Sequence, residues 1–259
     1  MRRWASHSEF TSPGVHGRAL AAIGPDPERA AAAIQGLLIH GGALDVYGLP
    51  RESFDRATLP VEDRLAAILA ADDRPLEEAR TPEGRAMGTC RDYAVLLCAA
   101  MREHGRPARV RCGFASYFEP GSWQDHWICE VWSDDRWRRI DAQLDAVTRR
   151  ALDIGFPPSD LPLAAFLSAD EAWRGCRDGR LDPEDFGHRP ARGLWFVHVD
   201  LVRDRLALAD RLTSAWDGWR AVTSGREQLS DRLIEFGDHL AEGEIAEAPP
   251  PPWWLSDRV

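Results

Sequence analysis

Apolar and polar residues follow a helical spacing in the first part of the chain. Alanine-rich residues 28–40 and residues 61–71 fit helices, with a glycine-rich turn between them that contains Tyr47. Residues 88–93 open a helix, and the apolar run over 93–101 ends before Gly105 and Pro107, which predicts that this helix is buried. A polar stretch that contains proline, residues 72–85, leads into this helix.

Between residues 109 and 141 the spacing changes to an alternation of every second residue. This pattern, rich in aromatic and β-branched residues, predicts strands over 109–114, 126–132 and 137–141, with a turn at 133–136. Helical spacing returns after residue 150 and predicts helices over 201–219 and 229–240. Together these elements predict an α+β fold in a single domain, residues 1–259, that ends in a Pro/Trp-rich tail over 246–259.

Composition narrows the class of protein. The formal net charge of −10 argues against a nucleic-acid partner, because phosphate binding requires a basic face. No apolar run approaches the roughly 20 residues that span a bilayer, and no secretion signal follows the N-terminal arginines. We expect no membrane partner and a cytoplasmic location. Nothing in the sequence indicates an oligomeric state.

The cysteines and two missing residue types bear on the chemistry. Five cysteines stand at positions 90, 98, 112, 129 and 176, and no CxxC pair occurs among them. Reduced thiols fit this pattern, and we expect neither a cofactor nor a metal. The chain contains no lysine and no asparagine, so all 32 basic side chains are arginine.

Cys90 stands in the first turn of the predicted buried helix. Thr89 is placed to cap that helix, and Asp92 is placed to return a hydrogen bond three residues later. The unpaired N–H groups and the dipole at a helix start favour the thiolate, the form of cysteine that attacks a carbonyl carbon. Cys90 is therefore the candidate nucleophile.

A cysteine nucleophile needs a histidine and a group that orients the imidazole. His126 begins a predicted strand, and Asp141 ends the strand that returns from the turn. A two-residue loop at Ser133–Asp134 would set His126 opposite Asp141, whereas a three-residue loop would place the two on opposite faces. A zinc site built from Cys90, His126 and Asp141 is a weaker alternative.

The order of these features resembles the transglutaminase-like superfamily. The resemblance covers about residues 84–145 and is carried by four segments: Gly88-x-Cys90, Gly105 to Val110, His126-Trp127 and Trp137-x-x-Ile140-Asp141. It implies a papain-like core in a bacterial single-chain member, with a catalytic helix packed on an antiparallel sheet and helical segments on both sides. It also implies Cys90 as nucleophile, His126 as general base and acid, and Asp141 as the orienting carboxylate.

The resemblance implies a cysteine hydrolase (peptidase or amidase) or an acyltransferase that works through a thioester. The substrate would be a peptide or a small amide or ester. Besides the Cys90 backbone N–H, Tyr47 is a candidate oxyanion donor, and Trp123 and Asp125 are candidate cleft residues. The competing hypothesis is an inert transglutaminase-like module that binds a peptide or protein. His198 and Asp200 are assigned to the lead-in of a strand or helix.

Overall fold

The computed structural model describes residues 2–188, 190–212 and 228–243. The chain divides into two compact units, each assembled from two segments of sequence. Unit 1 comprises Met1–Val110 and Ile128–Leu161, and unit 2 comprises Arg111–Trp127 and Pro162–Val259. The predicted tail over 246–259 lies outside the described residues, and the single domain expected from the sequence stays a prediction.

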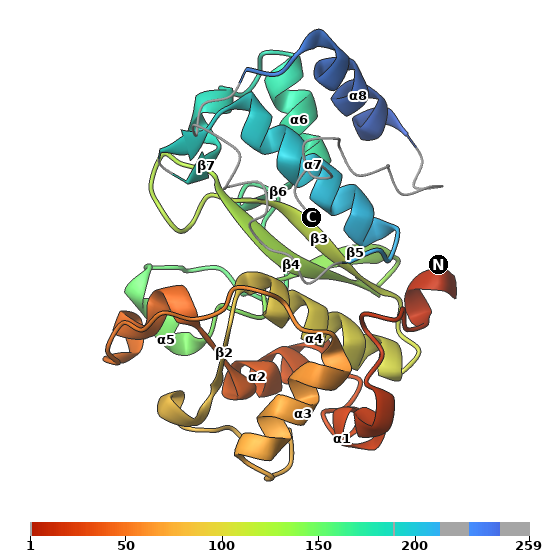
Figure 1. Ribbon diagram of the computed structural model, residues 1–259, viewed down its shortest axis with the longest axis vertical. Helices are drawn as coiled ribbons and strands as arrows, with labels where there is room; N and C mark the ends of the chain where they lie inside the picture. The colour runs from red at the N-terminus through yellow and green to blue at the C-terminus, as the bar shows by residue number, and fades with distance from the viewer. Residues whose placement is uncertain (1, 189, 213–227, 244–259) are drawn as a thin grey trace. The chain divides into compact units, whose positions relative to one another are not determined.

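Unit 1 is built mainly from helices. Helices α2 and α3 both contact α4, the helix that carries Cys90 (Figure 1). The predicted helix over 61–71 is confirmed as α3, with the same bounds. The helices of this unit are α1 (Gly17–Ala21), α2 (Pro27–Leu37), α3 (Val61–Ala71), α4 (Cys90–Glu103) and α5 (Ala146–Ala151). Short 3-10 helices are η1 (Arg2–Ala5), η2 (Gly14–His16), η3 (Gly41–Tyr47) and η4 (Pro82–Gly84).

The helix expected over residues 28–40 is wrong at its end. Helix α2 stops at Leu37, and Leu38–His40 form strand β1 instead. This strand pairs in parallel with β2 (Ala86–Gly88), with His40 opposite Gly88. The alanine-rich part favours a helix, but the last apolar residues are buried against a strand that lies far away in sequence. No local pattern could report that pairing.

Four strands form an antiparallel sheet in the order β5-β4-β3-β6. The three predicted strands are confirmed, each within two residues at its ends. The bounds are β3 (Ala108–Ala115), β4 (Gln124–Ser133), β5 (Arg136–Ile140) and β6 (Phe166–Ser168). Strands β3 and β4 each contribute residues to both units. Strand β4 pairs with β5 in unit 1, and β3 pairs with β6 in unit 2.

In unit 2, three helices pack on one another, with α7 against both α6 and α8 (Figure 1). Their bounds are α6 (Ala169–Arg177), α7 (Leu194–Leu208) and α8 (Asp231–Glu242). A short hairpin of β7 (Gly187–His188) and β8 (Ala191–Arg192) follows η5 (Pro183–Asp185). The helix expected over 201–219 begins earlier and ends at Leu208, and residues 213–219 of that prediction lie outside the described residues.

A buried aromatic cluster connects α7 with strand β3. Phe114 from β3 meets Phe186 edge-on, with the ring centroids 5.0 Å apart, and Phe196 of α7 lies beside it. Each of these three side chains is fully buried. Burying a large aromatic side chain stabilises a fold by about 1.5–3 kcal/mol, so this cluster anchors α7 to the strand.

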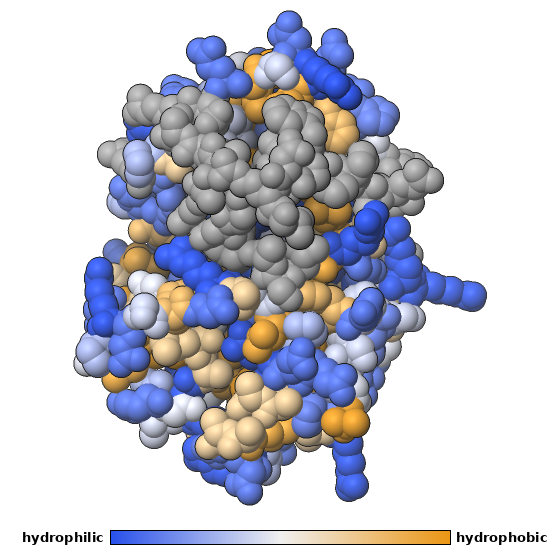
Figure 2. All heavy atoms as spheres, in the orientation of Figure 1, coloured by the Kyte–Doolittle hydropathy of each residue, from blue (hydrophilic) through white to orange (hydrophobic). Residues whose placement is uncertain are grey.

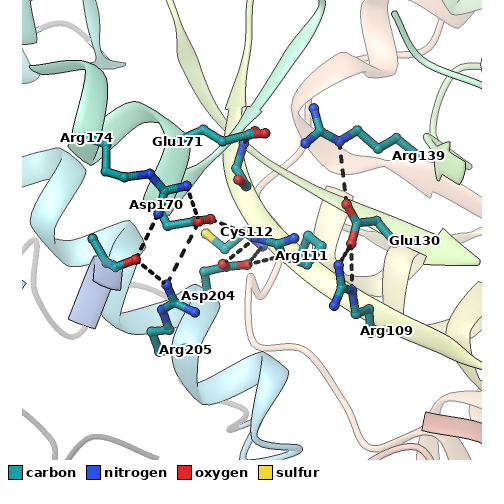
Figure 3. A network of polar contacts seen from close by, with 12 residues as sticks. Arg109, Arg111, Cys112, Glu130, Arg139, Asp170, Glu171, Arg174, Asp204 and Arg205 are labelled. Carbon is teal, nitrogen blue, oxygen red and sulfur yellow. Dashed lines mark hydrogen bonds and ion pairs between the residues drawn. The ribbon is translucent and has the colours of Figure 1, made fainter. Parts of the chain in front are cut away.

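Arginine–carboxylate networks join elements within each unit (Figure 3). In unit 2, Arg111 of β3 donates two hydrogen bonds of 2.9 Å to Asp204 of α7 and a third to Asp170 of α6. In unit 1, the buried carboxylate of Glu130 lies between Arg109 and Arg139. Each buried charge in these networks is paired with an opposite charge, which offsets the free-energy cost of removing it from water.

The surface turned toward the viewer mixes hydrophilic residues with scattered hydrophobic ones (Figure 2). Within the described residues, the exposed large hydrophobic side chains are Val15, Val147 and Leu163. They stand apart in sequence, and single exposed apolar residues are normal on protein surfaces.

Candidate active site

Cys90 is the first residue of α4, as the sequence predicts. A complete capping box closes the helix start: the Thr89 backbone N–H donates to Asp92 Oδ2 at 2.7 Å, and the Thr89 side chain accepts from the backbone of Asp92. Arg64 of α3 donates to the other oxygen of Asp92 at 2.6 Å. Cys90 is 6% exposed, and the hydrogen bonds of Thr89 and Arg64 to Asp92 stabilise the helix start on which it stands.

The body of α4 is fixed to the sheet within unit 1. The Cys98 thiol hydrogen-bonds that of Cys129 on β4, and Arg102 donates to the carbonyl oxygen of Ala108 on β3 at 3.0 Å. Burial is nearly complete along the helix, from Cys90 to Arg102. The expected packing of this helix on an antiparallel sheet is therefore observed. Such packing holds the first turn in place.

Asp141 follows directly on β5 and is 1% exposed. Its backbone N–H donates to the carbonyl oxygen of Pro158, and its carboxylate accepts the N–H of Gln143 at 2.9 Å. Burial raises the pKa of Tyr93, and the negative charges of Asp145 and Asp141 add to this rise. Tyr93 lies one helical turn after Cys90 on α4.

The hairpin differs from the expected one by one position. Ser133 pairs with Arg136, so the two-residue loop is Asp134–Asp135, and both loop residues have positive φ angles of 52° and 57°. This conformation is a tight turn that suits the twist of a hairpin. Continued by one residue, the register sets Asp141 opposite Ile128 rather than His126. Loop parity is unchanged, so alternation along β4 still predicts His126 and Asp141 on one face.

His126 lies in the first half of β4, in unit 2, and is 2% exposed. Two aromatic rings from the preceding loop surround it: the centroid of Phe118 is 4.9 Å away and that of Tyr117 is 6.0 Å away. Both rings meet the imidazole edge-on. This aromatic shell restricts the orientation of the ring.

Asp125 contacts side chains from two other elements of unit 2. The imidazole Nε2 of His188 on β7 contacts Asp125 Oδ1, and Arg203 of α7 lies 3.6 Å from Oδ2. Arg203 also donates to Asp200 at 2.7 Å. Burial raises the pKa of Asp200 to about 7, against the attraction of Arg203. Sequence analysis did not single out Arg203 or His188, because nothing local signals contacts across more than 60 residues.

The lesser candidates have structural contacts of their own. Tyr47 shares a hydrogen bond of 3.1 Å with the Thr148 hydroxyl, and Arg85 lies over its ring. Trp123 stacks on Phe186 with an interplanar angle of 8°, and its backbone N–H donates to the carbonyl oxygen of Asp185. A role for Tyr47, Trp123 or Asp125 in catalysis or substrate binding stays a prediction.

His198 and Asp200 lie inside α7, which begins at Leu194, rather than ahead of a helix. Both side chains are fully buried. The ring of His198 meets Trp173 at a centroid distance of 5.5 Å. Both residues therefore belong to the interior of unit 2.

Among residues 2–188, 190–212 and 228–243, no group of three or more His, Cys, Asp or Glu side chains is arranged to hold a metal ion. Over the same ranges, no helix is both long and apolar enough to span a bilayer.

Cys90 and Asp141 belong to unit 1 and His126 belongs to unit 2. The triad therefore stays a prediction.

Comparison with known proteins places this region in a family. Residues 67–142 match the model of the transglutaminase-like superfamily. The chain contains a transglutaminase-like domain. This domain includes Cys90, His126 and Asp141, together with α4 and the hairpin of β4 and β5. The α+β fold expected from the sequence is confirmed by the helices and the antiparallel sheet.

One solved structure similar to the chain is described as a "Putative Cysteine Protease" from Cytophaga hutchinsonii, with 16% sequence identity and a TM-score of 0.39. The similarity covers 64% of this chain and 44% of the other, so the chain spans less than half of that protein's length. No curated protein matches the chain significantly. The transglutaminase-like domain is thus the firmest link to known proteins.

Proposed function

We propose that the protein is a cysteine-dependent acyl-transfer enzyme that uses Cys90, His126 and Asp141. The observation that carries this proposal is the placement of Cys90 as the first residue of α4, where Thr89 and Asp92 form a complete capping box. The first backbone N–H groups of a helix have no partner within the helix, so at this position they are suited to donate to an acyl oxygen that gains charge beside Cys90. The match to the transglutaminase-like superfamily over residues 67–142 supports the same chemistry.

In the proposed reaction the sulfur of Cys90 attacks the carbonyl carbon of an amide or ester. His126 takes the thiol proton and returns it to the leaving group, while Asp141 orients the imidazole. The parity of the hairpin and the alternation along β4 support a position of His126 and Asp141 on the same face of the sheet. Water or another acyl acceptor then takes the acyl group from the thioester, and the Cys90 thiol is restored. The substrate we propose is a peptide or a small amide or ester.

The other thiols provide an internal comparison. Burial raises the pKa of Cys112 and of Cys129 well above the usual range, and it raises the pKa of Cys176 to about 12. Protonated thiols react slowly with alkylating reagents, because the thiolate is the nucleophile. We therefore expect iodoacetamide at pH 7.5 to label Cys90 at least tenfold faster than the other four cysteines, as measured by peptide mass spectrometry.

The test combines this labelling with a search for the covalent intermediate. A panel of amide and ester acyl donors is incubated with the protein, and the mass added to the Cys90 peptide is measured. Cys90→Ala should remove both adduct and turnover, whereas Cys98→Ala, on the same helix, should retain them. Equal labelling of all accessible cysteines, with no adduct, would contradict the proposal and favour an inert binding module.

A further inference from the structure

Strand β1 brings a second histidine beside the entry to the catalytic helix. His40 ends β1, and the parallel register sets it opposite Gly88, two residues before Cys90. The carboxyl ends of parallel strands lie at one edge of a sheet, and neighbouring strands are about 4.8 Å apart. His40 and Cys90 both belong to unit 1. The sequence alone does not indicate this placement, because the alanine-rich spacing over residues 28–40 predicts one continuous helix.

The orientation of the His40 ring is fixed by the turn that follows it. Its Nδ1 accepts the backbone N–H of Gly42 at 3.1 Å. In the neutral ring, the hydrogen is therefore on Nε2, which is a donor. A Cβ atom at Gly42 would lie 3.1 Å from Cε1 and 3.2 Å from Nδ1 of His40, so glycine lets the ring pack closely over the turn. The side chain is partly buried.

Attack on a carbonyl places negative charge on its oxygen, which needs donors held ready in place. The backbone N–H of Cys90 is one such group, since the first N–H groups of a helix have no partner within the helix. Tyr47, the donor candidate from the sequence, directs its hydroxyl to Thr148 on α5. His40 lies beside the segment that leads into Cys90 and has a donor of defined tautomer.

We propose that His40 is a catalytic residue whose Nε2–H donates the second hydrogen bond to the oxyanion. This inference rests on the proposed function, in which Cys90 is the nucleophile. A neutral imidazole is suited to the role, because it offers a hydrogen without competing with His126 for the thiol proton. His40 acts on the substrate oxygen and not on the sulfur.

With p-nitrophenyl acetate as probe, the step is written as follows. The Cys90 thiolate forms a C–S bond as the carbonyl π pair moves onto oxygen, and this oxyanion accepts hydrogen bonds from Cys90 N–H and His40 Nε2–H. The pair returns, the ester C–O bond breaks, and p-nitrophenolate leaves an acetyl thioester on Cys90. Water then releases acetate and restores the thiol.

The test compares two reactions of the same sulfur. Acylation by p-nitrophenyl acetate passes through an oxyanion, whereas alkylation by iodoacetamide displaces iodide at carbon and forms none. His40→Ala should slow acylation by about 10²–10³-fold, the usual loss for one oxyanion donor, and leave alkylation within about twofold. His40→Gln retains an N–H donor and should restore at least tenfold over His40→Ala.

His104→Ala is the matched control, because His104 caps the other end of α4 and is also partly buried. It should match the wild type in both reactions. Unchanged acylation in His40→Ala, or equal loss of acylation and alkylation, would overturn the inference. Circular dichroism identifies a variant that fails to fold, in which case His40→Gln decides by the same ratio of the two rates. Equal p-nitrophenolate release by wild type and Cys90→Ala would instead reject the proposed function itself.

Discussion

At the scale of single residues, His198 shows how burial sets the charge of a side chain. The imidazole lies on α7 between Trp173 and Phe236, with the ring of Phe236 at a centroid distance of 6.1 Å. Burial lowers the pKa of His198 to about 4, from the 6.5 of an exposed histidine. The folded protein therefore holds this ring neutral at pH values where the unfolded chain would protonate it.

This shift makes stability depend on pH in a defined direction. Between pH 6.5 and 4 the unfolded chain binds a proton that folded His198 does not, so the free energy of unfolding falls as the pH falls. The full effect is about 3 kcal/mol, at about 1.4 kcal/mol for each pKa unit. His198→Phe should flatten this part of the curve in urea unfolding at pH 4.5–7.5. His239→Gln, an exposed histidine on α8, should leave the slope unchanged, and an equal slope in both variants would contradict the argument.

At the scale of elements, the N-terminal end of β4 depends on a charge contact with α7. Arg203 reaches both Asp125 and Asp200, and its guanidinium lies 5.2 Å above the ring of Trp127. Asp125 immediately precedes His126 along the strand. This contact therefore supports the backbone next to the proposed general base.

Arg203→Met should leave two buried carboxylates without their shared cation. We expect a loss of about 3–5 kcal/mol in the free energy of unfolding, as for other buried pairs that lose one partner. The loss should be greater at pH 8 than at pH 5, because Asp200, with its pKa of about 7, is protonated at the lower pH and ionised at the higher one. Urea unfolding at both pH values measures it.

Arg180→Met is the matched control for this experiment. Arg180 pairs with Asp178 on the surface, where the two side chains are 70% and 47% exposed. Exposed pairs contribute about 0–1 kcal/mol, so this variant should unfold close to the wild type at both pH values. A similar loss in the two variants would show that α7 does not depend on the buried contact.

At the scale of the whole molecule, acidic residues outnumber basic ones, with 42 Asp and Glu against 32 Arg. The sequence isoelectric point is about 5.3, so the molecule repels its own copies at neutral pH. Repulsion between copies keeps a protein dispersed, and it vanishes when the net charge approaches zero.

We expect solubility to be lowest near pH 5.3 and to rise on both sides. Light scattering of a concentrated sample across pH 4.5–8 measures this, with a parallel series at high salt as the control, since salt screens the repulsion. The scattering peak should stay near pH 5.3, and the difference between pH 5.3 and pH 7.5 should shrink with salt. Maximal scattering at pH 7.5 would contradict this expectation.

The sequence by itself determined the elements whose signals are local. The capping pattern from Thr89 to Asp92 predicts the start of α4 to the residue, and alternation predicts β3, β4 and β5, because caps and pleats depend on neighbours a few residues apart. Helix α3 follows from its spacing alone. The same local pattern places Cys90 in the first turn of this helix and makes it the candidate nucleophile.

Only the tertiary structure decided the features that depend on distant partners. Leu38–His40 form a strand because Ala86–Gly88 offer one to pair with, and that pairing sets His40 beside the entry to α4. Arg203 and His188 meet Asp125 across 78 and 63 residues of sequence. The position of the tight turn at Asp134–Asp135 sets which residue lies opposite Asp141. Such contacts leave no periodic trace in the chain, because folding, and not sequence spacing, brings the partners together.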